Sequence, residues 1–197
     1  MAGGPATKDT STLALGLAQI RVGPATANIG FSYSVLLAAA SIGSLTKTSF
    51  TGNTEWWEHY AGFPQKKDYS LPIKEDAMLS AEYEEITPYN LALANGIDPT
   101  DGSYAGAHSG EIALGGKVAP AYVRMEAIYT YPSGTDYMHI IFPLSQVKSN
   151  LEIDLQASDS AKPGIEFISN VADSTNDDGH AAWDGKPLGA IQFTSDP

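Results

Sequence analysis

The sequence contains no cysteine among its 197 residues. A disulfide framework, a thiolate metal site and a cysteine nucleophile are therefore excluded. Disulfides are common in secreted proteins and rare in the cytosol, so this composition favours synthesis in the cytosol. Long apolar runs are missing as well. The apolar run at residues 35–42 is much shorter than the roughly 20 residues that span a bilayer, so we expect no membrane partner.

Positive charge is also scarce. The chain has 11 Lys and Arg against 23 Asp and Glu, which gives a formal net charge of -12. An acidic surface repels the phosphates of nucleic acids, so specific binding of DNA or RNA is not expected.

Motifs for catalysis are missing too. The segment at residues 110–117 resembles a phosphate-binding loop, but its Gly and Lys spacing is wrong. Glu82, Glu84 and Glu85 could supply a pair of catalytic carboxylates, but a polar strand face explains them without any chemistry and is the better interpretation. We predict that the protein is not an enzyme and holds no cofactor and no metal. The histidines are too far apart in sequence to form a ligand pair: His59, His108, His139 and His180.

Alternating and apolar segments separated by turn residues predict a mainly β protein. We expect an antiparallel β-sandwich or barrel of seven or eight strands in a single domain over residues 1–197, preceded by an N-terminal arm at residues 1–11. Residues 122–131 and 137–142 should form a β-hairpin around a turn at 132–136, with Arg124 and Glu126 opposite its apolar face. The expected strands are residues 12–22, 33–42, 74–85, 122–131, 137–142, 151–156, 165–171 and 188–193, with a short one possible at 111–114.

One short α-helix is predicted after residues 74–85. Thr87 is a suitable N-cap, and Pro88 occupies the first helical position, where its missing N–H costs nothing. Gly96 is the expected stop. The apolar side of this helix is formed by Leu91, Leu93 and Ala94.

Residues 46–72 have no clean periodicity, because glycines and prolines interrupt them. We therefore expect a long early loop here. Disordered segments are poor in aromatic residues, so this loop should pack against something. It is either a lid over its own core or a contact with a neighbouring subunit, with its aromatic side chains as interface anchors. Those side chains are Trp56, Trp57, Tyr60, Phe63 and Tyr69.

The residues that carry a family resemblance lie at 54–99. They read TEWWEHYAGFPQKKDYSLPIKEDAMLSAEYEEITPYNLALANGIDP: an acidic and aromatic segment, a Gly-Phe-Pro turn, a strand that begins with Lys and Glu, and the capped helix. Over this quarter of the chain the sequence resembles the tail tube (major tail) proteins of long-tailed bacteriophages and prophages.

The resemblance implies a structural protein of the virion. Members of this family stack as hexameric rings into a hollow tube, whose inner β-barrel receives strands from every subunit. It implies that the segment at 46–72 contacts the adjacent ring, that other tail proteins are partners, and that DNA passes through the lumen during ejection without specific binding. A lumen that repels phosphates needs negative charge. The candidates on predicted polar strand faces are Glu82, Glu84, Glu152 and Asp154.

Other functions remain open at this point. A carbohydrate-binding β-sandwich could use Trp56, Trp57 and Tyr60 as a stacking platform. A glycosidase-like enzyme with Glu82 or Glu84 would need a cleft that the sequence does not show. A capsid decoration protein or a tail-completion protein is a related structural alternative.

Overall fold

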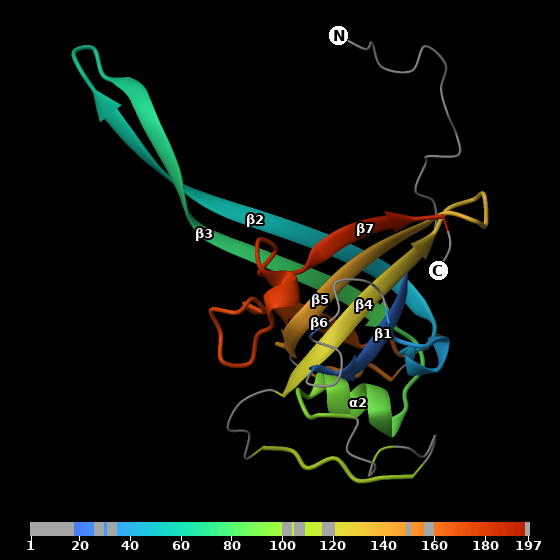
Figure 1. Ribbon diagram of the computed structural model, residues 1–197. Helices are drawn as coiled ribbons and strands as arrows, with labels where there is room; N and C mark the ends of the chain where they lie inside the picture. Colours follow the sequence, from blue (N-terminus) through green and yellow to red (C-terminus); the bar gives the residue numbers. More distant parts are fainter. Residues whose placement is uncertain are drawn as a thin grey trace.

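The computed structural model describes residues 18–25, 30, 35–99, 104, 109–115, 121–148, 151–155 and 160–195. The predicted arm at residues 1–11 and His108 lie outside them. Seven antiparallel strands and one α-helix are present in the described part (Figure 1), which confirms the prediction of a mainly β fold. The elements are β1 (Gln19–Pro24), η2 (Ala38–Ala40), β2 (Leu45–Ala61), β3 (Lys66–Tyr83), α2 (Pro88–Ala94), β4 (Tyr122–Thr130), β5 (Tyr137–Val147), β6 (Gly164–Ser169), η4 (Ala181–Trp183) and β7 (Ala190–Thr194).

The strands form one sheet in the order β1-β4-β5-β6-β3-β2, and β7 pairs with β5. This sheet is not closed into a barrel. The chain just before β2 does approach β1, because Ile42 N–H donates to the carbonyl of Ile20 at 3.0 Å and Ser41 bridges to Arg21. That contact is an isolated bridge and does not continue as a ladder.

Strand β5 is the centre of the sheet. One of its edges pairs with β4, while the other pairs with β7 over Tyr137–Ile141 and with β6 over Ser145–Val147. Both of its faces are buried. Ile140 and Phe142 belong to the main core, whereas Ile141 and Leu144 pack with Trp183 in a second, smaller core.

The predicted helix is confirmed as α2. The hydroxyl of Thr87 accepts a hydrogen bond from Asn90 N–H at 3.1 Å, and Gly96 has a φ of 73°, as a helix stop requires. Leu93 and Ala94 pack into the main core. The buried Asn90 side chain donates to the carbonyls of Ile42 and Glu85 at 2.8 and 2.6 Å, so it ties the helix to the chain on either side of the β2–β3 hairpin.

The side of β4 that carries Arg124 and Glu126, opposite its apolar face, is also buried. Arg124 and Glu126 are both fully buried and form an ion pair at 2.7 Å. The carboxylate of Glu126 also accepts the backbone N–H groups of Val35 and Leu36 at 2.9–3.2 Å. Burial lowers the pKa of the Arg124 guanidinium, and the attraction of Glu126 opposes that shift. The segment at 35–36 is thus held against the sheet by a charged group.

His139 of β5 is buried close to this pair. Its Nε2 lies 2.9 Å from the hydroxyl of Thr194 on β7, and its Nδ1 has no hydrogen-bond partner among the described residues. Burial lowers the pKa of His139; Arg21 of β1 adds to this lowering and Glu126 of β4 opposes it. The neutral imidazole therefore helps to hold β7 on β5.

Several expected elements are absent from the described residues. Residues 151–155 are not a strand, and Leu155 is exposed in spite of the alternating pattern. Residues 35–40 contain the short 3₁₀ turn η2 in place of a strand, and no strand forms within 109–115. Alternation in 151–156 satisfies the pattern for a strand, but the described residues of this segment pair with no strand. In contrast, the predicted hairpin and the strands at 165–171 and 188–193 are present as β4, β5, β6 and β7.

The buried ion pair gives a stability prediction. Arg124→Met should lower the free energy of unfolding by about 3–5 kcal/mol, because it leaves the buried carboxylate of Glu126 without this partner. The matched control is Lys47→Met. It removes the exposed Lys47–Glu82 pair at 3.9 Å and should cost less than about 1 kcal/mol. Urea unfolding measures both, and equal losses would contradict the importance of the buried pair.

The buried imidazole gives a pH prediction. The folded-state pKa of His139 lies below its ordinary value of 6.5, so its contribution to stability is fully present above about pH 6.5 and is lost as the pH falls toward the folded-state pKa. The free energy of unfolding should therefore decrease on acidification in this window. His139→Gln, which keeps a polar group near Thr194 but does not titrate, should weaken that decrease. An unchanged pH profile in the variant would show that His139 is not responsible.

Candidate assembly surface

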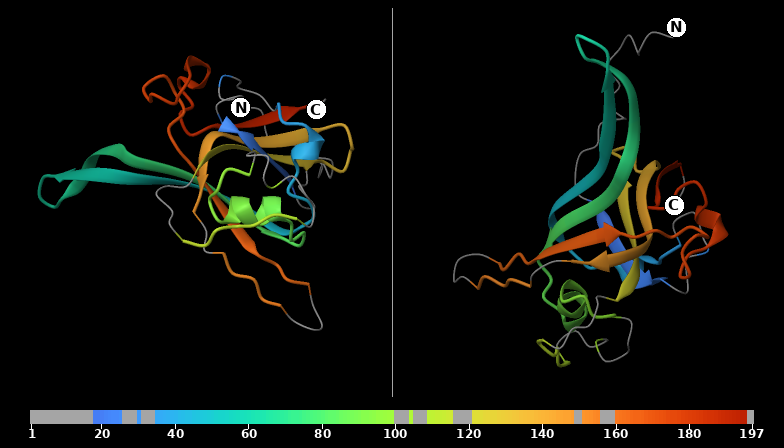
Figure 2. Two further views of the ribbon diagram at one scale, coloured as in Figure 1. Left: turned by 90° about the horizontal axis from the view of Figure 1, so that it is seen from below. Right: turned by 90° about the vertical axis from the view of Figure 1, so that its left-hand side faces the viewer.

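Residues 46–72 were expected to be an irregular loop, and that expectation is wrong. They belong to a long β-hairpin in which β2 pairs with β3 from Leu45–Tyr83 to Ala61–Lys66. Beyond the part of β3 that pairs with β6 (Met78–Glu82), this hairpin pairs with no other strand. We call its outer part, residues 52–77, the ribbon. It projects away from the sheet in every view (Figures 1 and 2).

These strands could not be recognised from the sequence, because the register of their pairing is interrupted. Shifts occur between Leu45 and Lys47, between Glu55 and Trp56 and between His59 and Tyr60. Each shift moves one strand by a residue relative to the other, so that the alternation of side chains breaks three times along the hairpin. Pro72 adds a further interruption, yet proline is tolerated where a strand has a free edge.

The ribbon carries aromatic side chains on both faces. Trp57 lies opposite Leu71, and its ring centroid is 6.5 Å from that of Tyr69 and 5.8 Å from that of His59. Residues directly opposite share a face, and successive residues alternate. Trp56 therefore lies on the other face, where it is opposite Pro72.

All five predicted anchor residues are on the ribbon, and all are exposed. Phe63, at the turn that joins the strands, is 103% exposed, while Trp56 and Trp57 are 54% and 47% exposed. None of them covers the core of its own chain, so the ribbon is not a lid. Leu71 and Ile73, which the sequence analysis did not name, add to the exposed apolar surface. Their position beside the aromatic residues was the only signal for them.

Polar pairs stiffen the end of the ribbon. Glu58 accepts from Tyr60 at 2.6 Å and forms an ion pair with Lys67 across the two strands. Hydrogen bonds from Lys67 and Tyr60 lower the pKa of Glu58, and the bond to Glu58 raises the pKa of Tyr60. His59 and Asp68 lie 2.7 Å apart. These groups are exposed, so they orient side chains more than they stabilise the fold.

Within the described residues, β2 and β7 each have one unpaired edge. Among the described residues, β2 pairs only with β3 and β7 pairs only with β5. The free edge of β2 is as long as the whole strand, 17 residues. An unpaired edge of this length can accept a strand from another chain.

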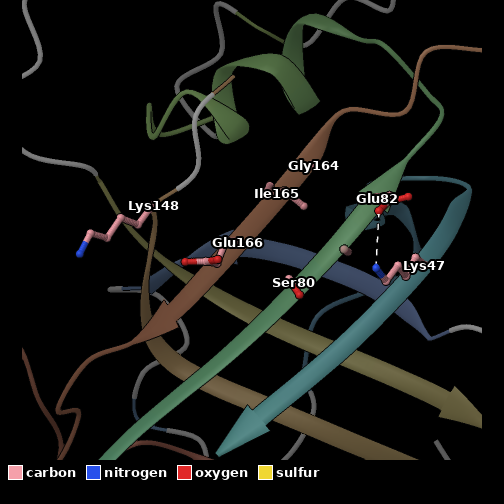
Figure 3. A pocket seen from close by; sticks show the side chains of 8 residues that line it. Lys47, Ser80, Glu82, Lys148, Gly164, Ile165 and Glu166 are labelled. Carbon is pink, nitrogen blue, oxygen red and sulfur yellow. Dashed lines mark ion pairs between the residues drawn. The ribbon is translucent and has the colours of Figure 1, made fainter. Parts of the chain in front are cut away.

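The predicted lumen residues do not come together as one surface. Glu82 lies in an open groove of about 370 Å³ on the polar face of β3 and β6, beside Lys47 (Figure 3). That groove also contains Lys148 and Glu166, so charges of both signs line it. It is not a strongly acidic wall.

The other three lumen candidates lie outside the strands. Glu84 follows β3 and accepts from the Ser160 hydroxyl at 3.3 Å. Glu152 and Asp154 are exposed in the segment 151–155.

Within the described residues, no group of three His, Asp or Glu side chains is arranged to bind a metal. The same residues include no helix with the length and hydropathy needed to cross a membrane.

No protein-family model matches the sequence, and no curated protein matches it. Among solved structures, the chain is similar over 99% of its own length and 99% of the other chain to the cryo-EM structure of the anti-feeding prophage cap, described as the AFP tube terminating cap. The sequence identity is 10% and the TM-score is 0.47. A likeness of this size carries no argument about activity, so the function is argued from the residues of this chain.

Proposed function

We propose that this chain is a structural, non-enzymatic subunit of a phage-type tail. Copies of it polymerise as stacked hexameric rings into the tail tube of a virion, where other tail proteins contact the tube and DNA passes through the lumen. The observation that carries this proposal is the ribbon with its exposed apolar side chains. These are Trp56, Trp57, Tyr60, Phe63, Tyr69, Leu71 and Ile73. The resemblance of residues 54–99 to tail tube proteins points the same way.

The ribbon of a single, unassembled chain has little to stabilise it. An isolated two-stranded hairpin is only marginally stable in water. Large contiguous apolar patches are rare on monomeric proteins and mark interaction sites. Tryptophan and tyrosine are enriched in the energetically dominant parts of protein interfaces. A second copy of the chain that covers the ribbon would bury these side chains and stabilise both strands.

The free edges of β2 and β7 support assembly in the same way. Pairing of strands between neighbouring copies would satisfy their backbone groups and remove an edge that otherwise favours aggregation. A ring in which every copy makes the same contact closes on itself.

The charge of the chain suits a channel for DNA. A net charge of -12 disfavours adhesion of phosphates to the wall. Since the groove at Glu82 contains Lys47 and Lys148 as well, we assign the repulsion chiefly to the exposed carboxylates of Glu84, Glu152 and Asp154.

The carbohydrate-binding alternative is less well supported. A stacking platform needs its aromatic rings on one surface, but Trp56 and Trp57 are successive residues of one strand and lie on opposite faces of the ribbon.

The test is assembly of the purified protein. Negative-stain electron microscopy and sedimentation velocity over a range of concentrations should show rings and tubes for the wild type. The double variant Trp56→Ser/Trp57→Ser should sediment as a monomer with an unchanged thermal unfolding curve, because both side chains are exposed and substitutions at such sites usually change stability by less than about 0.5 kcal/mol.

The matched control is Leu114→Ser, which removes an exposed apolar side chain outside the ribbon; Leu114 is 81% exposed. It should assemble as the wild type does. A wild-type protein that remains a monomer at all concentrations would contradict the proposal, and binding to a glycan array would then favour the carbohydrate alternative.

A further inference from the structure

A small apolar groove lies at the root of the ribbon, between β7 and the β2–β3 hairpin. Its volume is about 120 Å³. The ring of Phe50 lies 6.3 Å from that of Phe142 at this groove, and Phe50 and Ile191 are both partly exposed. No charged residue lines it. The main lining residues are Phe50, Ala77, Ile140, Phe142, Leu188 and Ile191.

We propose that this groove receives Phe63, at the ribbon turn, from a second copy of the chain. The proposal rests on the proposed function and specifies the receiving surface for the ribbon. The ribbon of the same chain cannot fill the groove. Nine residues of paired strand separate Gly52, which lies opposite Ala77, from Ala61, a span of about 30 Å at the usual rise of a strand. The ribbon also points away from the sheet (Figure 2).

The size of the groove fits one aromatic ring. Its volume of about 120 Å³ is close to that of the roughly 150 Å³ apolar cavity known to take up benzene in another protein. Phe63 is the most exposed large apolar side chain of the described residues. Because it is at the turn, it can enter a groove without displacement of the paired strands behind it.

The charges beside the two surfaces are complementary. Lys66 follows Phe63 by three residues at the start of β3. Glu75 precedes Ala77 by two residues, so it lies on the groove side of β3 and about 7 Å from Ala77 along the strand. Both side chains are exposed, and neither forms an ion pair within the described part of the chain. When Phe63 of one copy occupies the groove of another, Lys66 and Glu75 are within reach of each other.

The contact is heterologous, since the turn of one copy meets the groove of the next. An interface of this kind leaves one free turn and one free groove at the two ends of any oligomer that it does not close into a ring. Growth can therefore continue, as stacking of rings requires.

The absence of native cysteine permits a direct test. The double variant Phe63→Cys/Ile191→Cys places one thiol at the turn and one at the groove. Under mild air oxidation at the concentration where the wild type assembles, it should give a ladder of disulfide-linked dimers, trimers and larger species on a non-reducing gel. Each single variant should give dimers at most.

The control is Phe63→Cys/Leu114→Cys, in which the second thiol is more accessible than at Ile191 (81% against 47% exposed) but lies outside the groove. It should give no ladder. If the groove variant assembles by electron microscopy but forms no more cross-links than this control, the docking proposal is wrong while the proposed function stands. If the wild type does not assemble at all, both are wrong.

Charge reversal provides a second readout. Lys66→Glu or Glu75→Lys should raise the concentration needed for assembly roughly two- to fivefold, the usual size of an exposed charge pair. The double reversal should restore the wild-type concentration. Additive losses in the double variant would place the two side chains apart and overturn the proposed register.

Discussion

The fold depends on the pairing of β5 along both edges. Two different strands share one of these edges, and because β7 and β6 each occupy only part of it, the last segment of the chain must cross over the outer face of the sheet between them. That crossing contains η4 and buries Trp183 against β5. The pairing of β5 is thus accompanied by a second core on the outer face of the sheet. This core encloses the side of β4 that carries Arg124 and Glu126. The two side chains are buried there as an ion pair, which holds the neighbouring segments in place.

The ribbon differs from the rest of the molecule in the exposure of its apolar side chains. In the sheet, most large apolar side chains are buried within the chain and the exposed ones are scattered (Phe50, Tyr122, Ile191 and Phe193), whereas the ribbon gathers exposed tryptophan, tyrosine and phenylalanine on both faces. Its stiffness comes from backbone pairing and a few polar contacts at its end. It is therefore a preformed projection, and a partner that binds it need not order a loop first. Because the ribbon is preformed, the entropic cost of association is lower.

The sequence was most informative where local chemistry decides the structure. Thr87, Pro88 and Gly96 defined the helix to within a residue or two, and the turn at 132–136 defined the central hairpin. The sequence-based prediction was wrong where the structure of a segment depends on the strand that pairs with it. Residues 151–155 alternate as a strand should, yet they form no strand. Residues 46–72 lack alternation, yet on either side of the turn at 62–65 they belong to paired strands, because three register shifts absorb the irregularity. The aromatic residues were identified as candidate interface anchors, although their division between two faces could not be foreseen without the register. The predicted anchors share one ribbon, but the acidic candidates are dispersed.

The three tryptophans of this chain form two groups that differ in their expected fluorescence. Trp183 is enclosed, with the guanidinium of Arg124 at 5.7 Å and the ammonium of Lys186 at 5.1 Å from its ring. Trp56 and Trp57 are hydrated neighbours on the ribbon. The native emission spectrum is therefore a sum of a blue component from the interior and a red component from the ribbon, and an aqueous quencher reaches only the second. Loss of tertiary structure shifts the first component toward the red, whereas desolvation of the ribbon by another molecule shifts the second toward the blue. A single spectroscopic signal thus separates unfolding from association by the direction in which it moves.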